Sequence, residues 1–258
     1  MSRWSPHDLR EVALTTARLA ADHIRSRTEP QGVYATKSTP TDVVTRTDMA
    51  VEEFIRGELE RFVPGSSIVG EEFDDVEGHS GVGWVIDPLD GTVNFVYGMP
   101  IVSVSIAATL GREPAAGVVV DVFGGETFMA SRGGGAFLDG RPIRVTTLDD
   151  LSSALLCTGF SYDAGIRGEQ ADRLGKLLRR ISNLRALGSA ALHLCWVAAG
   201  RFDGYFETDL KRWDYAAGMI IAAEAGARVE VPGDDNGDFL LVTTPGIFDE
   251  LRPLVAPA

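Results

Sequence analysis

The sequence predicts an α+β N-terminal part, residues 1–145, followed by an α/β C-terminal part, residues 146–258. Two observations predict this organisation. In the first part, two helical segments precede a run of short β segments that are separated by glycine turns. In the second part, β segments alternate with helical segments, which is typical of a layered α/β architecture. We therefore expect a mostly antiparallel first half and a layered second half.

Apolar residues recur at helical spacing in two segments near the N-terminus. Ser5 and Pro6 are typical of a helix start, and the pattern after them predicts a helix that ends near Arg27. A second helix is predicted over 48–62, because its apolar residues repeat every three to four positions. The intervening segment 28–40 contains two prolines and a glycine, which predicts a loop or a hairpin.

Short apolar runs beside turn residues predict the strands. One strand is expected over 67–70 and another over 83–87, where Pro88 should end the strand because it has no N–H to donate. Three longer β segments follow over 102–110, 116–123 and 126–130. In the second part we expect strands over 154–157, 202–206, 227–231 and 240–243, and helices over 169–181, 189–199 and 214–225.

The composition is that of a globular protein with an acidic balance. There are 24 Lys and Arg against 37 Asp and Glu, which gives a net charge of 24 − 37 = −13. This charge disfavours nucleic acid as a partner, because a broad grip on nucleic acid requires clustered basic residues. Cys157 and Cys195 lie in apolar stretches and are expected to be buried free thiols. Neither a secretory signal nor a membrane span is recognised, so we expect a cytoplasmic protein that does not bind membranes.

Asp87 and Asp90 are the most informative pair of residues. Asp87 follows an apolar run, and Asp90 with Gly91 forms a turn pair that lets the chain reverse closely. Both carboxylates can therefore converge on one point, with the carbonyl oxygen of Leu89 between them. Oxygen ligands of this kind suit Mg²⁺. The alternative is an ordinary polar turn with solvated aspartates.

The residues after this pair predict an anion site beside it. Gly91 and Thr92 open a short helical segment over 93–97, and the N–H groups at a helix start bind anions. Metal ligands next to such a helix start suggest a phosphate bridged to divalent cations. Gly133–Gly135, in contrast, lacks the Lys-Ser/Thr of a phosphate-binding loop and is expected to be a hairpin turn.

Other segments also place carboxylates at strand ends or helix starts. Glu71 and Glu72 follow the strand 67–70, and because successive side chains alternate, at most one of them is expected to reach a shared site. Asp48 and Asp214 open helices, where an Asp is also a common cap. Each position alone is compatible with a structural role. Together they favour one functional site.

At these residues the sequence resembles the inositol monophosphatase family, and within it the bacterial SuhB-type members. The resemblance covers nearly the whole chain and is carried by 37–48, 70–72, 84–95, 188–191 and 213–218. The haloacid dehalogenase phosphatases need Asp-x-Asp at a strand end, so the Asp-x-x-Asp spacing here disfavours that class. The resemblance implies a layered αβαβα sandwich that forms a homodimer, and it implies inhibition by Li⁺.

Carried onto this chain, the resemblance implies a role for each matching residue. The ligands of two or three Mg²⁺ ions would be Glu71, Asp87, the Leu89 carbonyl, Asp90 and Asp214. Gly91 and Thr92 would bind phosphate through backbone N–H groups. Asp48, Thr92 and Glu71 would be catalytic, by orienting and activating the attacking water. The substrate would be contacted by Asp90, Gly188, Ser189, Ala190, Glu207 and Asp214.

The activity implied is Mg²⁺-dependent hydrolysis of a phosphorylated polyol, with inositol 1-phosphate as the expected substrate. Histidinol phosphate, fructose 1,6-bisphosphate and adenosine 3′,5′-bisphosphate, which relatives of this fold hydrolyse, stay open as alternatives. A second class also stays open, because some SuhB-type proteins associate with RNA polymerase or ribosomal RNA and act by binding.

Two residues outside these roles are interpreted from their surroundings. Lys37 belongs to the segment 28–40, from which it could fold over the site or stay solvated. His193 has no second metal ligand at a suitable spacing and lies in an apolar segment, so it is expected to be a core or interface residue.

Overall fold

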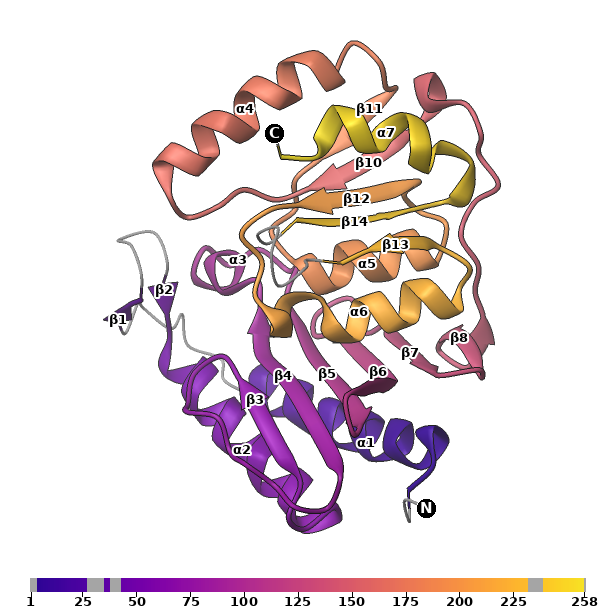
Figure 1. The fold of residues 1–258 in the computed structure, drawn as a ribbon. Coiled ribbons are helices and arrows are strands. Elements are labelled where there is room, and N and C mark those ends of the chain that lie inside the picture. The colour runs from indigo at the N-terminus through magenta and orange to yellow at the C-terminus, as the bar shows by residue number, and fades with distance from the viewer. Residues whose placement is uncertain (1–3, 27–34, 38–42, 232–238, 258) are drawn as a thin grey trace.

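The computed structural model describes residues 4–26, 35–37, 43–231 and 239–257, and these residues form two main sheets and seven α-helices (Figure 1). The helices are α1 (Pro6–Ser26), α2 (Arg46–Phe62), α3 (Thr92–Val96), α4 (Ala164–Leu177), α5 (Ala190–Ala198), α6 (Arg212–Glu224) and α7 (Phe248–Val255).

The first half supplies a seven-stranded sheet in the order β3-β4-β5-β6-β7-β8-β9. Its strands are β3 (Ser67–Gly70), β4 (Val82–Asp90), β5 (Ser103–Leu110), β6 (Glu113–Asp121), β7 (Thr127–Ser131), β8 (Gly135–Leu138) and β9 (Arg141–Pro142). Strands β3 and β4 are parallel, and each following pair is antiparallel. The expected mostly antiparallel first half is therefore confirmed.

The second half supplies a five-stranded mixed sheet in the order β11-β10-β12-β14-β13. Its strands are β10 (Leu155–Thr158), β11 (Asn183–Arg185), β12 (Gly204–Glu207), β13 (Arg228–Glu230) and β14 (Leu240–Thr243). Strand β10 is parallel to both of its neighbours, whereas β14 is antiparallel to β12 and β13.

A small antiparallel pair is formed by β1 (Ala35–Thr36) and β2 (Val43–Val44). The loop or hairpin expected over 28–40 therefore contributes one strand to this pair. Residues 28–34 and 38–42, which include Asp42 of the segment 37–48, lie outside the described residues.

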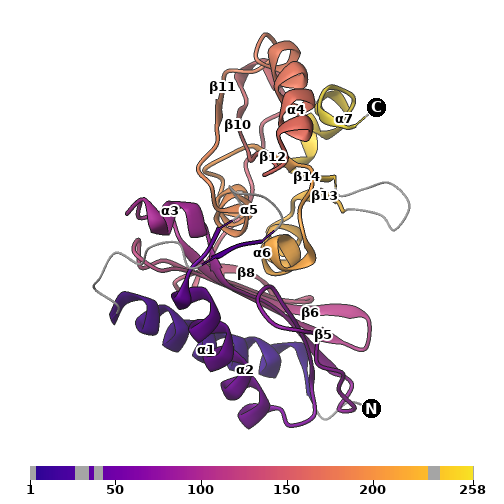
Figure 2. The ribbon, with the colours of Figure 1, turned by 90° about the vertical axis from the view of Figure 1, so that its left-hand side faces the viewer.

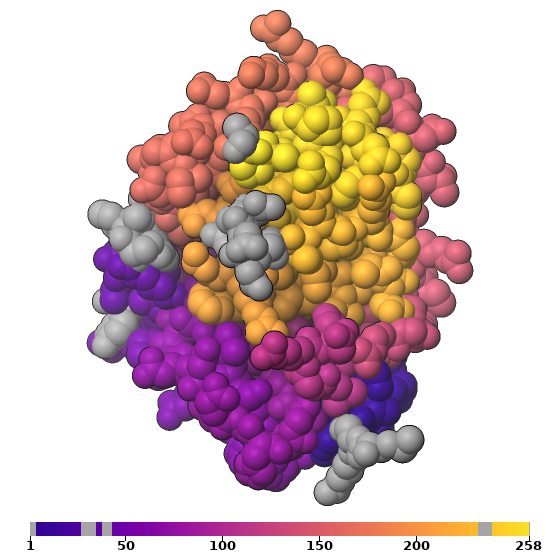
Figure 3. Space-filling model, viewed as in Figure 1, coloured from indigo at the N-terminus to yellow at the C-terminus, as the bar shows by residue number. Residues whose placement is uncertain are grey.

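Five layers follow one another when the molecule is viewed along the sheets (Figure 2). Helices α1 and α2 pack on one face of the seven-stranded sheet. Helices α5 and α6 fill the space between its other face and the five-stranded sheet, and α4 and α7 cover the outer face of the latter. This is the expected αβαβα sandwich. The two halves lie directly against each other in the space-filling view (Figure 3).

Strand β4 is covered on both faces, and all nine of its residues are buried. Alternate side chains face opposite cores: Trp84 and Ile86 pack toward α1 and α2, whereas Val85 packs toward α5 and α6. A strand that is covered on both faces needs an apolar run rather than an alternating one, which is what precedes Asp87 in the sequence. The carboxylates at its end are therefore carried on a fixed element.

Several predicted boundaries were wrong. Pro88 does not end β4, which pairs with β5 as far as Asp90 after a register shift. Helix α4 begins at Ala164, where Asp163 caps it, and ends at Leu177, so 169–181 was placed about five residues too late. Strand β11 and helix α7 were not predicted, and an interior Pro253 obscures the pattern of α7.

None of the helices in the described ranges is both long enough and apolar enough to cross a bilayer. The division at residue 145 stays a prediction about folding units. The core between the two sheets draws residues from both sides of that boundary.

Candidate active site

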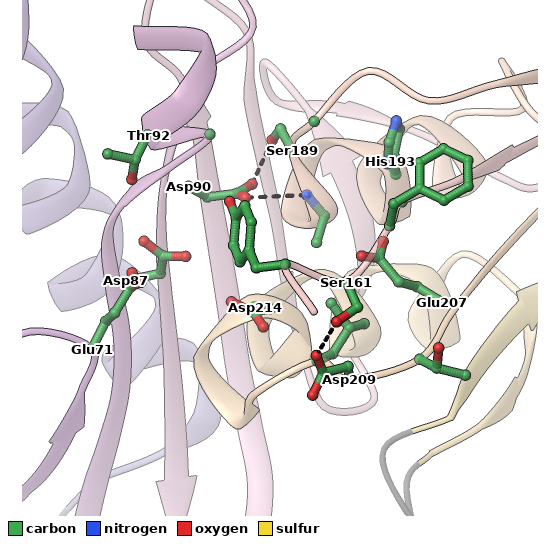
Figure 4. A pocket seen from close by; sticks show the side chains of 18 of the residues that line it. Glu71, Asp87, Asp90, Thr92, Ser161, Ser189, His193, Glu207, Asp209 and Asp214 are labelled. Atoms are coloured by element: carbon green, nitrogen blue, oxygen red, sulfur yellow. Dashed lines mark hydrogen bonds between the residues drawn. The ribbon is translucent and has the colours of Figure 1, made fainter. Parts of the chain in front are cut away.

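One cleft lies where the end of β4 meets the starts of α5 and α6 and the end of β12 (Figure 4). It encloses about 740 Å³, including its open mouth. Glu71 and Asp87 stand on one side, with Glu207 and Asp209 on the opposite side (Figure 4). The predicted site residues that line it are Glu71, Asp87, Leu89, Asp90, Gly91, Thr92, Gly188, Ser189, Ala190, Glu207 and Asp214.

A β-bulge brings Asp87 and Asp90 to the same side. In a regular strand, side chains three residues apart point to opposite faces. Here Asp87 pairs with Ser105 and Asp90 pairs with Ser103, so two residues of β4 stand opposite one residue of β5. The extra residue restores the common direction of both carboxylates. Pro88 fits this bulge because it has no N–H to contribute to the ladder.

Asp90 joins the two halves of the molecule. Its carboxylate accepts hydrogen bonds from the Ser103 hydroxyl at 3.0 Å and from the N–H groups of Ala190 and Ala191 at 3.1 and 3.0 Å. It also accepts a short hydrogen bond from the hydroxyl of Ser189, the N-cap of α5. A carboxylate at a helix N-terminus is favoured by the helix dipole. Ser189 and Ala190, which the resemblance assigns to the substrate, therefore also hold Asp90.

Asp48 caps helix α2 and also accepts a hydrogen bond from Thr92. Its Oδ2 accepts hydrogen bonds from the N–H of Thr45 at 2.9 Å and from the Thr45 hydroxyl, which completes a capping box at the start of α2. Its Oδ1 accepts a hydrogen bond from the Thr92 hydroxyl at 2.9 Å, and the same hydroxyl lies 3.1 Å from the Leu89 carbonyl. Asp48 is 1% exposed and does not line the cleft, so it reaches the site only through Thr92.

Glu71 lines the cleft, whereas Glu72 does not. The ammonium group of Lys37 lies 2.7 Å from Oε1 of Glu71 and 2.6 Å from Oε1 of Glu72. Lys37 therefore folds over the edge of the cleft and does not extend into solvent. Burial, followed by repulsion from Glu71, raises the pKa of Glu72 to about 7.

The carboxyl groups in the cleft are electrostatically unfavourable to one another. Burial raises the pKa of all four: Glu71, Asp87, Asp90 and Asp214. For Asp87 the next causes are the charges of the other three. Among the described residues that line the cleft there is no Lys or Arg. A bound cation would reduce the repulsion within such a cluster.

The far end of the cleft is where sequence reasoning missed most residues. The loop after β10 and the loop after β12 supply seven lining residues that were not predicted: Gly159, Phe160, Ser161, Tyr162, Thr208, Asp209 and Leu210. Asp209 has a positive φ of 70°, which is uncommon outside glycine and often occurs at functional sites. Its carboxylate accepts a hydrogen bond from Ser161.

Glu207 is held at this end by its neighbours. The hydroxyl of the fully buried Tyr205 donates to its Oε2. A Cβ on Gly159 would lie 2.1 Å from the same oxygen, so glycine leaves the room that the carboxylate occupies. Burial raises the pKa of Glu207 to about 7.

His193 also lines the cleft and is 1% exposed. Its Nε2 accepts a hydrogen bond from the N–H of Leu187 at 3.2 Å, and no partner of its Nδ1 is found among the described residues. The expected core position is correct, but only one of the two ring nitrogens is satisfied. Burial lowers the pKa of His193 from 6.5 to about 4, so the ring is neutral at pH 7.

This pKa predicts a loss of stability in acid that depends on His193. The unfolded chain takes up a proton near pH 6.5 and the folded chain only near pH 4, so stability falls as the pH is lowered through this window. Between pH 7 and 4.5 we expect wild type to lose about 2–3 kcal/mol more than His193→Gln. Urea unfolding of both proteins at both pH values measures the difference, and equal losses would contradict it.

The chain is similar to one family of known proteins along most of its length. The model of the inositol monophosphatase family matches residues 5–249. The chain is 44% identical to "Inositol-1-monophosphatase SuhB" of Mycobacterium tuberculosis over 95% of its own length and 92% of that protein. It is 40% identical to "Nus factor SuhB" of Escherichia coli over 86% and 85% of the two lengths.

A solved structure shares the whole fold. The suhB protein of Bartonella henselae superimposes with a TM-score of 0.88 at 32% identity, covering 96% of this chain and 98% of the other. Sequence, fold and cleft therefore lead to the same result: this chain belongs to the inositol monophosphatase family, whose members are phosphoric monoester hydrolases.

Proposed function

We propose that the protein hydrolyses inositol 1-phosphate in a Mg²⁺-dependent reaction. The observation that carries the proposal is the gathering of Glu71, Asp87, Asp90 and Asp214 in one cleft, from three separate segments, where burial raises the pKa of each carboxyl group. The name of the Mycobacterium tuberculosis relative supports the choice of substrate.

The donor set fits a hard divalent cation. Carboxylates and a backbone carbonyl are the ligands that Mg²⁺ prefers. In this proposal Glu71, Asp87 and the Leu89 carbonyl hold one ion, and Asp87, Asp90 and Asp214 hold a second, with Glu71 contributing to a third. No group of three His, Cys, Asp or Glu among the described residues is yet close enough to hold one ion. The Leu89 carbonyl and water would therefore complete the ligands of each ion.

Bound cations would neutralise the phosphate and lower the pKa of water. The chain's own residues would then direct the attack. Thr92 donates its hydroxyl proton to Asp48, so the lone pairs of its oxygen are free to accept a hydrogen bond from the attacking water. Asp48, buried and with a pKa raised by burial, is placed to receive the proton that Thr92 relays. Gly91 and Thr92, at the start of α3, would orient the phosphate through their N–H groups.

The far end of the cleft favours a monophosphate. A second phosphate on the substrate would face Glu207 and Asp209, and no basic side chain lines the described part of the cleft. This disfavours fructose 1,6-bisphosphate and adenosine 3′,5′-bisphosphate. Phosphate release from a panel of inositol 1-phosphate, histidinol phosphate and both bisphosphates tests the proposal. The bisphosphates should be the poorest substrates, and a preference for either would contradict this assignment.

Glu207→Gln is expected to weaken recognition of the alcohol without slowing the chemistry. A carboxylate accepts hydrogen bonds from substrate hydroxyls more strongly than an amide does. At pH 8, above the pKa of about 7, the wild-type carboxylate is ionised. The KM for inositol 1-phosphate should rise about tenfold or more with kcat little changed. Phenyl phosphate, which lacks these hydroxyls, is the control. An equal rise in KM for both esters would contradict the role of Glu207.

The name of the Escherichia coli relative favours a second candidate, a binding role in transcription. Cation binding with no turnover on any phosphate monoester would support that role over catalysis. The leading proposal also includes a homodimer, inhibition by Li⁺ and a cytoplasmic location. These three properties are proposed only because the chain belongs to this family. Light scattering in solution and assays with added Li⁺ test the first two.

A further inference from the structure

Glu52 is a buried carboxylate that lies outside the cleft. It belongs to α2, its side chain is 0% exposed, and its ion-pair partner Arg56 is 14% exposed. A buried ion pair is weak evidence for stability, because removing both charges from water costs as much as their attraction returns. The contacts of the pair indicate another role.

The pair binds the backbone of the segment that follows Glu71. Glu52 accepts hydrogen bonds from the N–H of Glu72 at 2.8 Å and from the N–H of Phe73 at 3.3 Å. Arg56 donates to Glu52 at 2.8 Å, and its two remaining nitrogens donate to the carbonyls of Phe73 at 3.0 Å and Asp74 at 3.1 Å. Three consecutive residues are thus fixed to α2 by charged groups.

The residue before Glu71 is fixed as well. A Cβ on Gly70 would lie 2.3 Å from Oε1 of Glu52, so the end of β3 and this carboxylate approach as closely as glycine permits. The Glu71 backbone is therefore confined between Gly70, which touches Glu52, and Glu72, which is hydrogen-bonded to it.

This confinement opposes the electrostatic repulsion between Glu71 and the neighbouring carboxylates. The Glu71 carboxylate lies beside that of Asp87 (Figure 4), and like charges repel each other, although the ammonium group of Lys37, 2.7 Å from Glu71, offsets part of this repulsion. Repulsion of this kind favours an outward movement of the segment 71–74. The charge-assisted hydrogen bonds of Glu52 and Arg56 hold the same segment inward.

We propose that Glu52 and Arg56 are positioning residues that set the location of Glu71 for cation binding. The inference rests on the proposed function in one respect, namely that Glu71 holds a cation. Neither residue touches the substrate or the ion. Their effect is exerted through the backbone of residues 71–74, as partners beyond the ligands commonly tune metal sites.

The test is titration of metal-free protein with Mg²⁺ by calorimetry. Glu71→Gln identifies the part of the binding that depends on Glu71. Glu52→Gln should weaken that part about tenfold, and Arg56→Lys, which keeps the charge but loses the planar fork, should weaken it by a smaller factor. Raising Mg²⁺ should restore kcat in both variants, because Glu71 itself is intact.

Asp203→Asn is the matched control. Asp203 also holds backbone, since it accepts hydrogen bonds from the Leu155 N–H at 2.9 Å and the Thr146 hydroxyl at 2.7 Å, but it lies outside the cleft. It should lower the melting temperature without changing Mg²⁺ affinity. The Arg56→Lys variant keeps the test decisive should Glu52→Gln fail to fold.

Two results would overturn the inference, and they are distinguishable. Wild-type Mg²⁺ affinity in folded Glu52→Gln and Arg56→Lys would show a structural role only, while leaving the proposed function intact. Unchanged Mg²⁺ affinity in Glu71→Gln would show that Glu71 holds no cation. The positioning role of Glu52 and Arg56 would then be refuted as well.

Discussion

Replacing Asp87 with Asn is expected to abolish phosphate release while stabilising the metal-free protein. Asp87 is 2% exposed, and burial together with the charges of Glu71, Asp90 and Asp214 raises its pKa well above the usual range. A neutral amide removes that repulsion and can donate to the adjacent Glu71. Its oxygen can still accept the hydrogen bond from the N–H of Leu89, which lies 3.0 Å from Oδ1.

The two effects of Asp87→Asn have different sizes. Loss of a ligand shared by both proposed ions should cost several kcal/mol of transition-state stabilisation, so kcat should fall about a thousandfold or more. The metal-free protein should gain about 1–2 kcal/mol of unfolding free energy, as is common when a functional site is relieved. Phosphate release in saturating Mg²⁺ and urea unfolding in EDTA measure the two quantities.

Asp121→Asn controls for the loss of a buried carboxylate elsewhere. Asp121 is 7% exposed, and burial raises its pKa, but it only closes a turn by accepting a hydrogen bond from the N–H of Gly124 at 2.7 Å. This variant should keep wild-type turnover. Near wild-type turnover in Asp87→Asn as well would refute the assignment of the cleft. Asp90→Asn is a less clear test, because Asp90 also holds the start of α5.

Removing divalent cations is expected to eliminate turnover and to lower the melting temperature. The four carboxylates repel one another in a buried cleft, and cations that bind only the folded state stabilise it by mass action. At a Mg²⁺ concentration 100 times its Kd the gain is about 2.7 kcal/mol for one site. For a chain of this length that corresponds to a rise of roughly 5–10 °C.

Differential scanning fluorimetry across a Mg²⁺ titration, with phosphate release measured in parallel, checks this expectation. The Asp87→Asn variant should show a smaller thermal shift, because it has less repulsion to relieve and one ligand fewer. Turnover that survives exhaustive treatment with EDTA would contradict the role of the cleft. An equal thermal shift in wild type and Asp87→Asn would contradict it independently.

The local sequence identified most of the carboxylates that line the cleft, but not how they are arranged. Asp87 and Asp90 were recognisable because they follow an apolar strand and precede a glycine. Their side chains point the same way only because β4 bulges between the pairs Asp87–Ser105 and Asp90–Ser103. The sequence of β4 alone does not specify its register with a partner strand. Pro88 was wrongly predicted to end the strand because the pairing of β4 with β5 beyond the bulge is not visible in the local sequence.

The elements that were missed share a physical cause. Strand β11 is an edge strand of three residues, which is too short for a recognisable pattern. It forms only because the folded chain places it beside β10, which is distant in the sequence. The loops that contribute Phe160, Tyr162 and Asp209 to the cleft have no periodicity, and only folding brings them opposite Asp87. The contacts of Glu52 cannot be found from its local sequence, because the N–H groups that it binds lie 20 and 21 residues away.

The most direct measurement of the central claim is a crystal structure of the protein grown with Mn²⁺ and phosphate, with data collected at the manganese absorption edge. We expect anomalous peaks within coordinating distance of Asp87, Asp90, Asp214 and Glu71, and phosphate against the N–H groups of Gly91 and Thr92. A cleft without anomalous density, with these four carboxylates pointing apart, would contradict it.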